Sequence, residues 1–100
     1  MIRLNKNNNG DSVNVRVGQL FEVALHENPS TGFTWHIEPS ELWTVENNDF
    51  HGEPLVGAGG ERVWKFLAVH EGGAAFKAES RRASGPAVET FLVNITVEAA

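Results

Sequence analysis

Four histidines are the residues of this chain that invite acid–base or metal chemistry. None of them lies at a zinc-type spacing from another histidine or beside a carboxylate-rich box, so we expect surface or strand-edge histidines. The serines lack the Gly-x-Ser-x-Gly context of a hydrolase, and the sequence has no cysteine to act as nucleophile, thiolate ligand or disulfide partner. We therefore expect no catalytic residue, no metal and no cofactor. The histidines are His26, His36, His51 and His70.

Residues 28–35 indicate a rigid loop that could recognise a partner. Their sequence is Asn-Pro-Ser-Thr-Gly-Phe-Thr-Trp. Asn28 followed by Pro29 favours a β-turn, because proline fixes its own φ and pushes the residue before it towards extended geometry. Gly32 relieves the backbone where the turn ends, and two aromatic residues then alternate with a threonine. The segment is therefore short, preshaped and anchored. Taken alone, it is also compatible with an ordinary loop of a hairpin or sandwich.

Two further irregular segments follow. Residues 51–60 are rich in glycine, and the apolar pair Leu55-Val56 lies just ahead of the glycines. Residues 80–89 form a polar segment that contains Arg81 and Arg82. We expect both segments to be loops.

Alternating apolar and polar residues predict the strands that hold these loops. No helical period of useful length occurs, and we expect at most one helical turn, at Glu41-Leu42. A tight polar turn is expected at residues 7–11, and a turn at residues 71–73 after which the chain runs back. The predicted strands lie near residues 2–4, 13–17, 21–25, 33–37, 43–50, 64–68, 74–78 and 91–97.

Strands separated by turns roughly every eight to twelve residues are typical of an all-β sandwich. We expect an immunoglobulin-like β-sandwich of about seven or eight strands with Greek-key connections. In such a fold alternate loops collect at the same end. If the three segments join the strand pairs B–C, D–E and F–G, they lie side by side at one pole.

Length and composition indicate one globular domain over residues 1–100, with 41% hydrophobic residues and a formal net charge of −5. The negative charge argues against a nucleic-acid binder, because Arg81 and Arg82 form the one basic pair. No apolar run is long enough to span a membrane, and the first residues lack the apolar region of a signal peptide. As written, the chain is expected to be soluble, cytoplasmic and monomeric, without a membrane partner.

Taken together and in this order, the three segments resemble the chagasin family, the inhibitors of papain-like cysteine peptidases. Residues 28–33 match its Asn-Pro-x-Thr-Gly-aromatic motif, Trp35 matches the tryptophan two residues on, and residues 57–60 match its Gly-x-Gly-Gly motif. Residues 43–47 and 91–97 also look like family positions, so the resemblance covers nearly the whole chain.

The third segment departs from the family pattern. Family members typically have Arg-Pro-Trp there, with Gly-Pro nearby, whereas this chain has Arg81-Arg82-Ala83-Ser84-Gly85-Pro86. The arginine and the Gly-Pro are kept, and the proline and the tryptophan are absent. Since tryptophan is a frequent hot spot of interfaces, we expect weaker or differently selective inhibition.

The resemblance implies a reversible, competitive and noncovalent inhibitor that blocks the cleft of a papain-like, cathepsin-type cysteine peptidase with three loops. It implies that the first segment lies over the catalytic pair with Thr31 nearest and that the second pairs with the peptidase main chain. It also implies that Arg81 of the third segment contacts the opposite wall. The implied peptidase-binding residues are Asn28, Pro29, Ser30, Thr31, Gly32, Phe33, Leu55, Val56, Gly57, Ala58, Gly59, Gly60, Arg81, Arg82 and Ala83.

Two other function classes remain open at this point. The same loops would suit an immunoglobulin-like binding or adhesion module with an unrelated partner, because a fold alone does not define a function. The joint presence of the two motifs at one pole favours the inhibitor, since a generic module has no reason to carry both. An enzyme has the least support, because no nucleophile stands in a catalytic context.

Overall fold

The computed structural model describes residues 1–55 and 57–100, which form eight strands and two short 3-10 helices. Val56 lies outside the described residues. In chain order the elements are β1 (Ile2–Leu4), η1 (Lys6–Asn8), β2 (Ser12–Arg16), β3 (Leu20–Glu27), η2 (Pro29–Thr31), β4 (Thr34–Ile37), β5 (Trp43–Gly52), β6 (Gly60–Ala68), β7 (Gly72–Arg81) and β8 (Glu89–Glu98).

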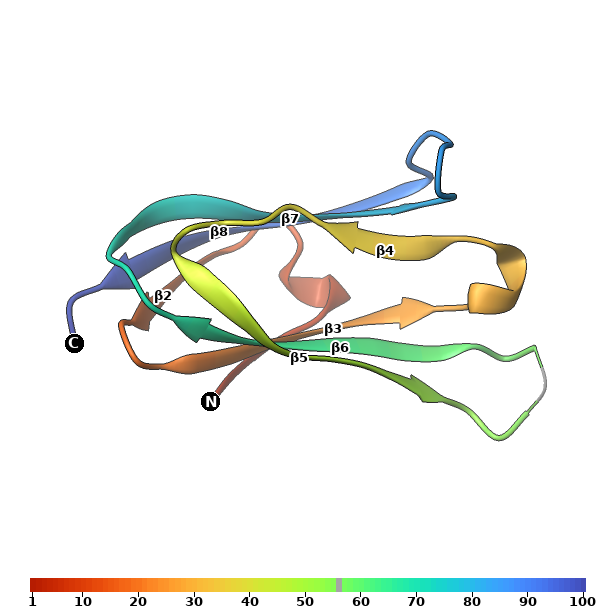
Figure 1. Ribbon diagram of the computed structural model, residues 1–100, viewed down its shortest axis with the longest axis horizontal. Coiled ribbons are helices and arrows are strands. Elements are labelled where there is room, and N and C mark those ends of the chain that lie inside the picture. The colour runs from red at the N-terminus through yellow and green to blue at the C-terminus, as the bar shows by residue number, and fades with distance from the viewer. Residues whose placement is uncertain (56) are drawn as a thin grey trace.

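The strands form two four-stranded sheets that pack face to face as an immunoglobulin-like sandwich, as the alternation predicts (Figure 1). One sheet has the order β1-β3-β6-β5 and the other the order β2-β8-β7-β4. The first strand of each sheet is parallel to its neighbour, β1 to β3 and β2 to β8, and the remaining pairs are antiparallel. The prediction of an all-β sandwich is therefore confirmed.

Aromatic side chains fill the space between the sheets. Phe21 of β3 and Phe66 of β6 stack at 5.1 Å between ring centroids, and Phe76 of the opposite sheet meets Phe66 edge to face at 5.2 Å. Trp64 is 1% exposed and Trp43 is 4% exposed, so both tryptophans are core residues. This core fixes the ends of the strands from which the loops project.

Several local predictions need correction. Residues 41–42 form a bend and no helical turn, and the 3-10 helix η1 occupies part of the predicted polar turn. The chain turns and runs back after β6, as predicted (Figure 1). The turn is not a hairpin, because β7 lies in the other sheet and begins already at Gly72. Alternation reveals that a segment is a strand, but the choice of partner depends on long-range packing.

Three loops meet at one end of the sandwich, at the right of Figure 1. We call residues 28–33 the first loop, residues 53–59 the second loop and residues 82–88 the third loop. The first loop crosses from one sheet to the other, whereas the second and third loops close the hairpins β5–β6 and β7–β8. The prediction that they share one pole is confirmed. Their bounds are narrower than predicted, because the flanking strands continue to Gly52 and Arg81.

Among the described residues there is no helix with the length and hydrophobicity needed to cross a bilayer.

Candidate inhibitory site: three loops at one pole

The first loop is a single 3-10 turn that its own side chains hold in shape. Asn28 is extended and its Oδ1 accepts hydrogen bonds from the backbone N–H of Ser30 at 3.3 Å and from the Ser30 hydroxyl at 2.6 Å. The hydroxyl of Thr31 donates to the Asn28 carbonyl at 2.7 Å. Gly32 closes the turn with a φ of 84°, a value that residues with a Cβ rarely adopt. The predicted turn at Asn28-Pro29 is therefore present, and its tip is exposed.

The second loop lies against the first. The side-chain Nδ2 of Asn28 donates to the carbonyl oxygen of Gly57 at 2.8 Å. Gly59 approaches so closely that a Cβ placed on it would lie 2.7 Å from the Glu27 carbonyl oxygen and 2.9 Å from the Asn28 Cβ. Only glycine allows this approach at a φ of 75°. The Gly-x-Gly-Gly motif thus lets the second loop dock on the base of the first.

The third loop contacts the first through an arginine and an aromatic ring. The guanidinium carbon of Arg82 lies 4.8 Å from the ring centroid of Phe33, within the range of a cation–π contact. Arg81 points its guanidinium back to its own loop, where Nη1 donates to the carbonyl of Ala83 at 2.9 Å and to that of Arg82 at 3.3 Å. The three loops therefore form one continuous surface centred on the first loop.

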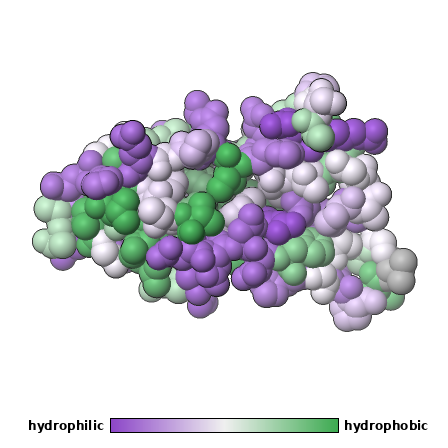
Figure 2. Space-filling model, in the orientation of Figure 1, coloured by the Kyte–Doolittle hydropathy of each residue, from purple (hydrophilic) through white to green (hydrophobic). Residues whose placement is uncertain are grey.

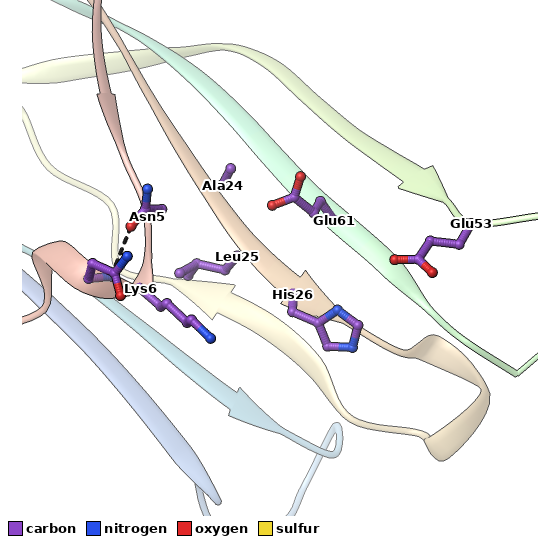
Figure 3. Close-up of a pocket in the computed structure, with 8 residues that line it drawn as sticks. Asn5, Lys6, Ala24, Leu25, His26, Glu53 and Glu61 are labelled. Atoms are coloured by element: carbon purple, nitrogen blue, oxygen red, sulfur yellow. Dashed lines mark hydrogen bonds between the residues drawn. The ribbon is translucent and has the colours of Figure 1, made fainter.

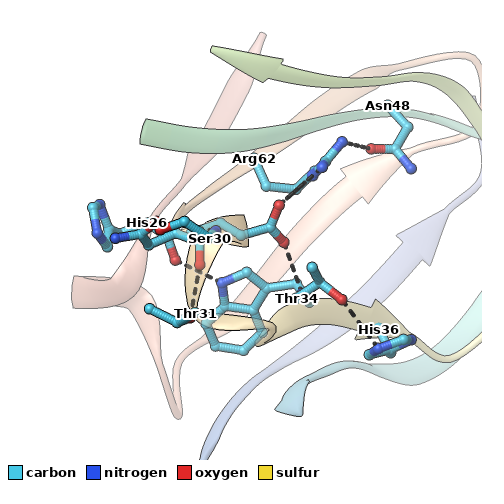
Figure 4. Close-up of polar contacts among 10 residues, drawn as sticks. His26, Ser30, Thr31, Thr34, His36, Asn48 and Arg62 are labelled. Atoms are coloured by element: carbon cyan, nitrogen blue, oxygen red, sulfur yellow. Dashed lines mark hydrogen bonds and ion pairs between the residues drawn. The ribbon is translucent and has the colours of Figure 1, made fainter. Parts of the chain in front are cut away.

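A buried carboxylate lies beneath that surface. Glu27, at the end of β3, has a side chain only 1% exposed, and it accepts hydrogen bonds from the Trp35 backbone N–H at 2.8 Å and from Arg62 at 2.8 and 3.1 Å. Arg62 also donates to the side-chain oxygen of Asn48 on β5 at 3.1 Å (Figure 4). Because Glu27 and Trp35 flank the first loop, this network joins its base to the hairpin that carries the second loop.

This network is the part of the site that the sequence analysis did not predict. A signal was present, because Phe21, Val23 and Leu25 face the core and the same period places Glu27 on that face. Arg62 likewise occupies the core-facing register of β6. A charged residue in a core register beside a loop indicates a buried ion pair at the loop base.

The outer surface of the pole is mixed in polarity. Two large hydrophobic side chains are strongly exposed there, Leu55 at 75% in the second loop and Val88 at 63% in the third. Figure 2 shows that this end of the molecule is mostly white and purple on the visible face, with green confined to small areas. Such mixed polarity is compatible with protein binding, because interfaces as a whole are about as apolar as the rest of a protein surface.

A hollow of about 420 Å³ lies beside the loops, along the outer side of β3 (Figure 3). Lys6 and Asn5 form one wall, and Glu53, Glu61 and His26 form the other. Within the described residues no group of three histidine, aspartate or glutamate side chains could hold a metal ion. The exposed ridge of loops, and not this hollow, brings the predicted binding residues together.

Most of the predicted binding residues meet on this ridge. Pro29, Ser30, Thr31 and Gly32 are exposed at its centre, and Gly57 is exposed beside them. Gly60 differs, because it is buried in β6, where a Cβ would collide with the backbone of β5. The prediction for Val56 falls outside the described residues.

Comparison with known proteins agrees with this geometry. Residues 14–97 match the profile of the "Chagasin family peptidase inhibitor I42". The chain belongs to the chagasin family. The match includes the three loops and the strands β3 to β7 in full, and β2 and β8 in part. Strand β1 lies outside it. As a member of a family of peptidase inhibitors, the chain is not an enzyme, and the adhesion module is not favoured.

Two similar proteins and one solved structure show how far the likeness extends. Chagasin of Trypanosoma cruzi is 42% identical over 66 residues, which cover 58% of this chain and 60% of that protein, so less than two thirds of chagasin is matched. Amoebiasin-1 of Entamoeba histolytica is 29% identical over 100 residues. The alignment covers 95% of this chain and 98% of that protein. The crystal structure of the cysteine protease inhibitor EhICP2 from Entamoeba histolytica superposes with a TM-score of 0.86 at 19% identity, covering 97% of this chain and 94% of that one. This likeness supports the fold.

Proposed function

We propose that this protein is a reversible, competitive and noncovalent inhibitor of papain-like, cathepsin-type cysteine peptidases, in which residues 1–100 act as a single monomeric domain. The observation that carries the proposal is the hydrogen bond from Asn28 to the Gly57 carbonyl. It joins the two family motifs into one rigid surface at the pole where the third loop also lies. Family membership supplies the function class, and the loops supply the means.

The first loop would enter the cleft above the catalytic thiolate and histidine, with Thr31 nearest to them. A peptidase of this class acts on an extended peptide, whereas the first loop is a closed 3-10 turn. Its backbone therefore does not present a peptide bond in the conformation that the nucleophile attacks. The domain occupies the cleft without being cleaved.

The second loop would pair with the peptidase through main-chain hydrogen bonds. Open space surrounds Gly57, because a Cβ there would have no neighbour within 4 Å. A second backbone has room to approach at this point, and the exposed Leu55 adds an apolar contact beside it. The third loop would reach the opposite wall through Arg82 and Ala83, while Arg81 donates a hydrogen bond to the carbonyl of Ala83 within the domain.

Preorganisation explains how a small domain could bind tightly. Ordering an interface costs about 0.5–1.5 kcal/mol per immobilised side chain, and internal hydrogen bonds in the first loop remove part of that cost before binding. The loops need not fold on the target.

Titration of papain or a cathepsin against a peptide substrate tests the proposal. We expect residual activity to fall with added protein and to recover on dilution, because no covalent bond forms. Absence of inhibition at micromolar protein would overturn the proposed function.

A further inference from the structure

The three loops carry a single positively charged side chain. Their 20 residues include two charged ones, Glu53 in the second loop and Arg82 in the third, although the whole chain has a formal net charge of −5. An acidic protein therefore presents one arginine within the three loops, next to Arg81 at the end of β7.

Arg82 is held in place and is still open to a partner. Its guanidinium carbon lies 4.8 Å from the ring centroid of the half-buried Phe33. Its Nε lies 3.8 Å from the position of a Cβ on Gly32, so the absence of a side chain there leaves room for the arginine against the first loop. No carboxylate of residues 1–55 and 57–100 forms an ion pair with Arg82.

Arg81 has a different role in spite of its adjacent position. Its guanidinium donates to the carbonyls of residues 82 and 83, and its Nε lies 3.6 Å from a carboxylate oxygen of Glu79. These contacts occupy Arg81 within the domain. Of the two adjacent arginines, Arg82 is the one presented outward.

We propose that Arg82, supported by Phe33, receives a carboxylate on the wall of the peptidase cleft that faces the third loop, and so selects peptidases with an acidic wall. The inference rests on the proposed function and adds the charge of the partner surface. A guanidinium offers planar, paired donors that match a carboxylate, and stacking on an aromatic face limits the freedom it loses on binding. The rest of the acidic chain repels such a wall, so the interaction depends on this residue.

The competing explanation is that Arg82 only covers Phe33 with its aliphatic part. Two substitutions separate the explanations. Arg82→Met keeps an unbranched cover over the ring and removes the charge, whereas Arg82→Glu reverses the charge. Arg16→Glu is the matched control, because Arg16 is exposed at the end of β2, away from the loops, and the change in net charge is the same (Figure 1).

The experiment measures inhibition constants and association rates for a panel of papain-like peptidases of known structure. The panel is ordered by the number of carboxylates on the cleft wall that faces the third loop. We expect Arg82→Glu to weaken inhibition about tenfold or more for peptidases with an acidic wall and little for those with a neutral wall, with the loss reduced at high salt. Arg82→Met should lie between the wild type and Arg82→Glu.

The outcomes are distinguishable. Suppose that the wild type inhibits, but Arg82→Glu weakens the inhibition of every peptidase by the same factor, or weakens it no more than Arg16→Glu does. The inference is then wrong and the proposed function stands. If Arg82→Met equals the wild type against acidic walls, the covering explanation holds and the inference is wrong. If the wild type inhibits no member of the panel, the proposed function is overturned, and this inference with it.

Discussion

The side-chain amide of Asn28 donates a hydrogen bond of 2.8 Å to the carbonyl oxygen of Gly57, across 29 positions of the sequence. The same side chain caps the first loop through its Oδ1. One asparagine therefore shapes the first loop and fastens the second loop to it. This double role gives a physical reason for the joint occurrence of the Asn-Pro-x-Thr-Gly and Gly-x-Gly-Gly motifs.

Asn28→Asp separates the two roles of this side chain. An aspartate keeps an oxygen that accepts from Ser30 but cannot donate to the Gly57 carbonyl. We expect the loop contact to lose at least about 1 kcal/mol and inhibition to weaken at least about fivefold, because the bond is lost and a charged oxygen then faces the carbonyl oxygen of Gly57. Amide hydrogen exchange in the second loop should become faster. Ser30→Ala is the control, because it removes only a bond within the first loop, and equal exchange in both variants would contradict the role given to Asn28.

Gly59→Ala tests the close approach of the first two loops. Gly57 and Gly59 have φ values of 81° and 75°, so alanine is strained by a similar amount at either position. Only at residue 59 does the added Cβ meet backbone atoms. We expect Gly57→Ala to lower the free energy of unfolding by about 1 kcal/mol. Gly59→Ala should lower the free energy of unfolding by about 1–3 kcal/mol more, because the added Cβ overpacks the contact between the two loops. Denaturant unfolding measures both, and equal losses would rule out the contact.

Glu27→Gln tests the buried carboxylate under the first loop. The glutamine leaves Arg62 without its ionic partner, and Arg62 is itself 24% exposed. We expect a loss of about 2 kcal/mol in the free energy of unfolding, less than for a fully buried pair because water still reaches the arginine. The measurement is chemical denaturation.

Glu22→Gln is the matched control for Glu27→Gln on the same strand. Its partner Arg3 is 75% exposed and the two charges lie 3.6 Å apart, so the change should cost less than about 1 kcal/mol. A second variant, Glu27→Gln with Arg62→Met, removes both charges and should regain part of the stability. Equal losses for Glu27→Gln and Glu22→Gln would show that the buried pair contributes nothing special.

Much of the fold could be predicted from the sequence, because alternation in β3 and β8 is a local signal. The shared pole of the three loops follows from Greek-key order once they are assigned to the strand pairs B–C, D–E and F–G. Strand partners could not be predicted in the same way: a turn after β6 was expected, but the sequence did not reveal that β7 lies in the opposite sheet. Alternation is a property of one segment, whereas pairing depends on contacts between distant segments.

The same difference between local signals and long-range contacts applies to the candidate site. The turn at Asn28 and Pro29 is local, and the sequence was sufficient to predict it. The contact of Arg82 with Phe33 and the pair of Glu27 with Arg62 join residues 49 and 35 positions apart, and no local pattern reveals such partners. The hydrogen bonds of the Arg81 guanidinium to the carbonyls of residues 82 and 83 likewise have no signature in the sequence.

Ala83→Trp restores the aromatic residue that family members have in the third loop. Ala83 is exposed, so the larger side chain fits without disturbing the core. We expect inhibition to tighten about tenfold or more, mainly through slower dissociation, because a buried tryptophan at an interface is often worth about 2 kcal/mol. Surface plasmon resonance separates the two rates. Ala87→Trp, also exposed in the third loop, is the control, and an unchanged dissociation rate for Ala83→Trp would contradict the engagement of this loop.

Thr31→Glu places a charge at the exposed tip of the first loop. Thr31 makes only local hydrogen bonds, so the domain should stay folded with little change in its melting temperature. Inhibition should weaken by about a hundredfold, as expected for a bulky charge without a partner at the centre of an interface. Circular dichroism and an inhibition assay on the same sample check both parts, and loss of the folded signal would mean that this tip is structural.

The most direct test of the central claim is the pattern of inhibition at several substrate concentrations. If the three loops occupy the cleft of a papain-like peptidase, the apparent KM for a peptide substrate rises linearly with the inhibitor concentration and kcat stays constant. A fall in kcat at constant KM would mean that the protein binds away from the cleft, and would contradict the account.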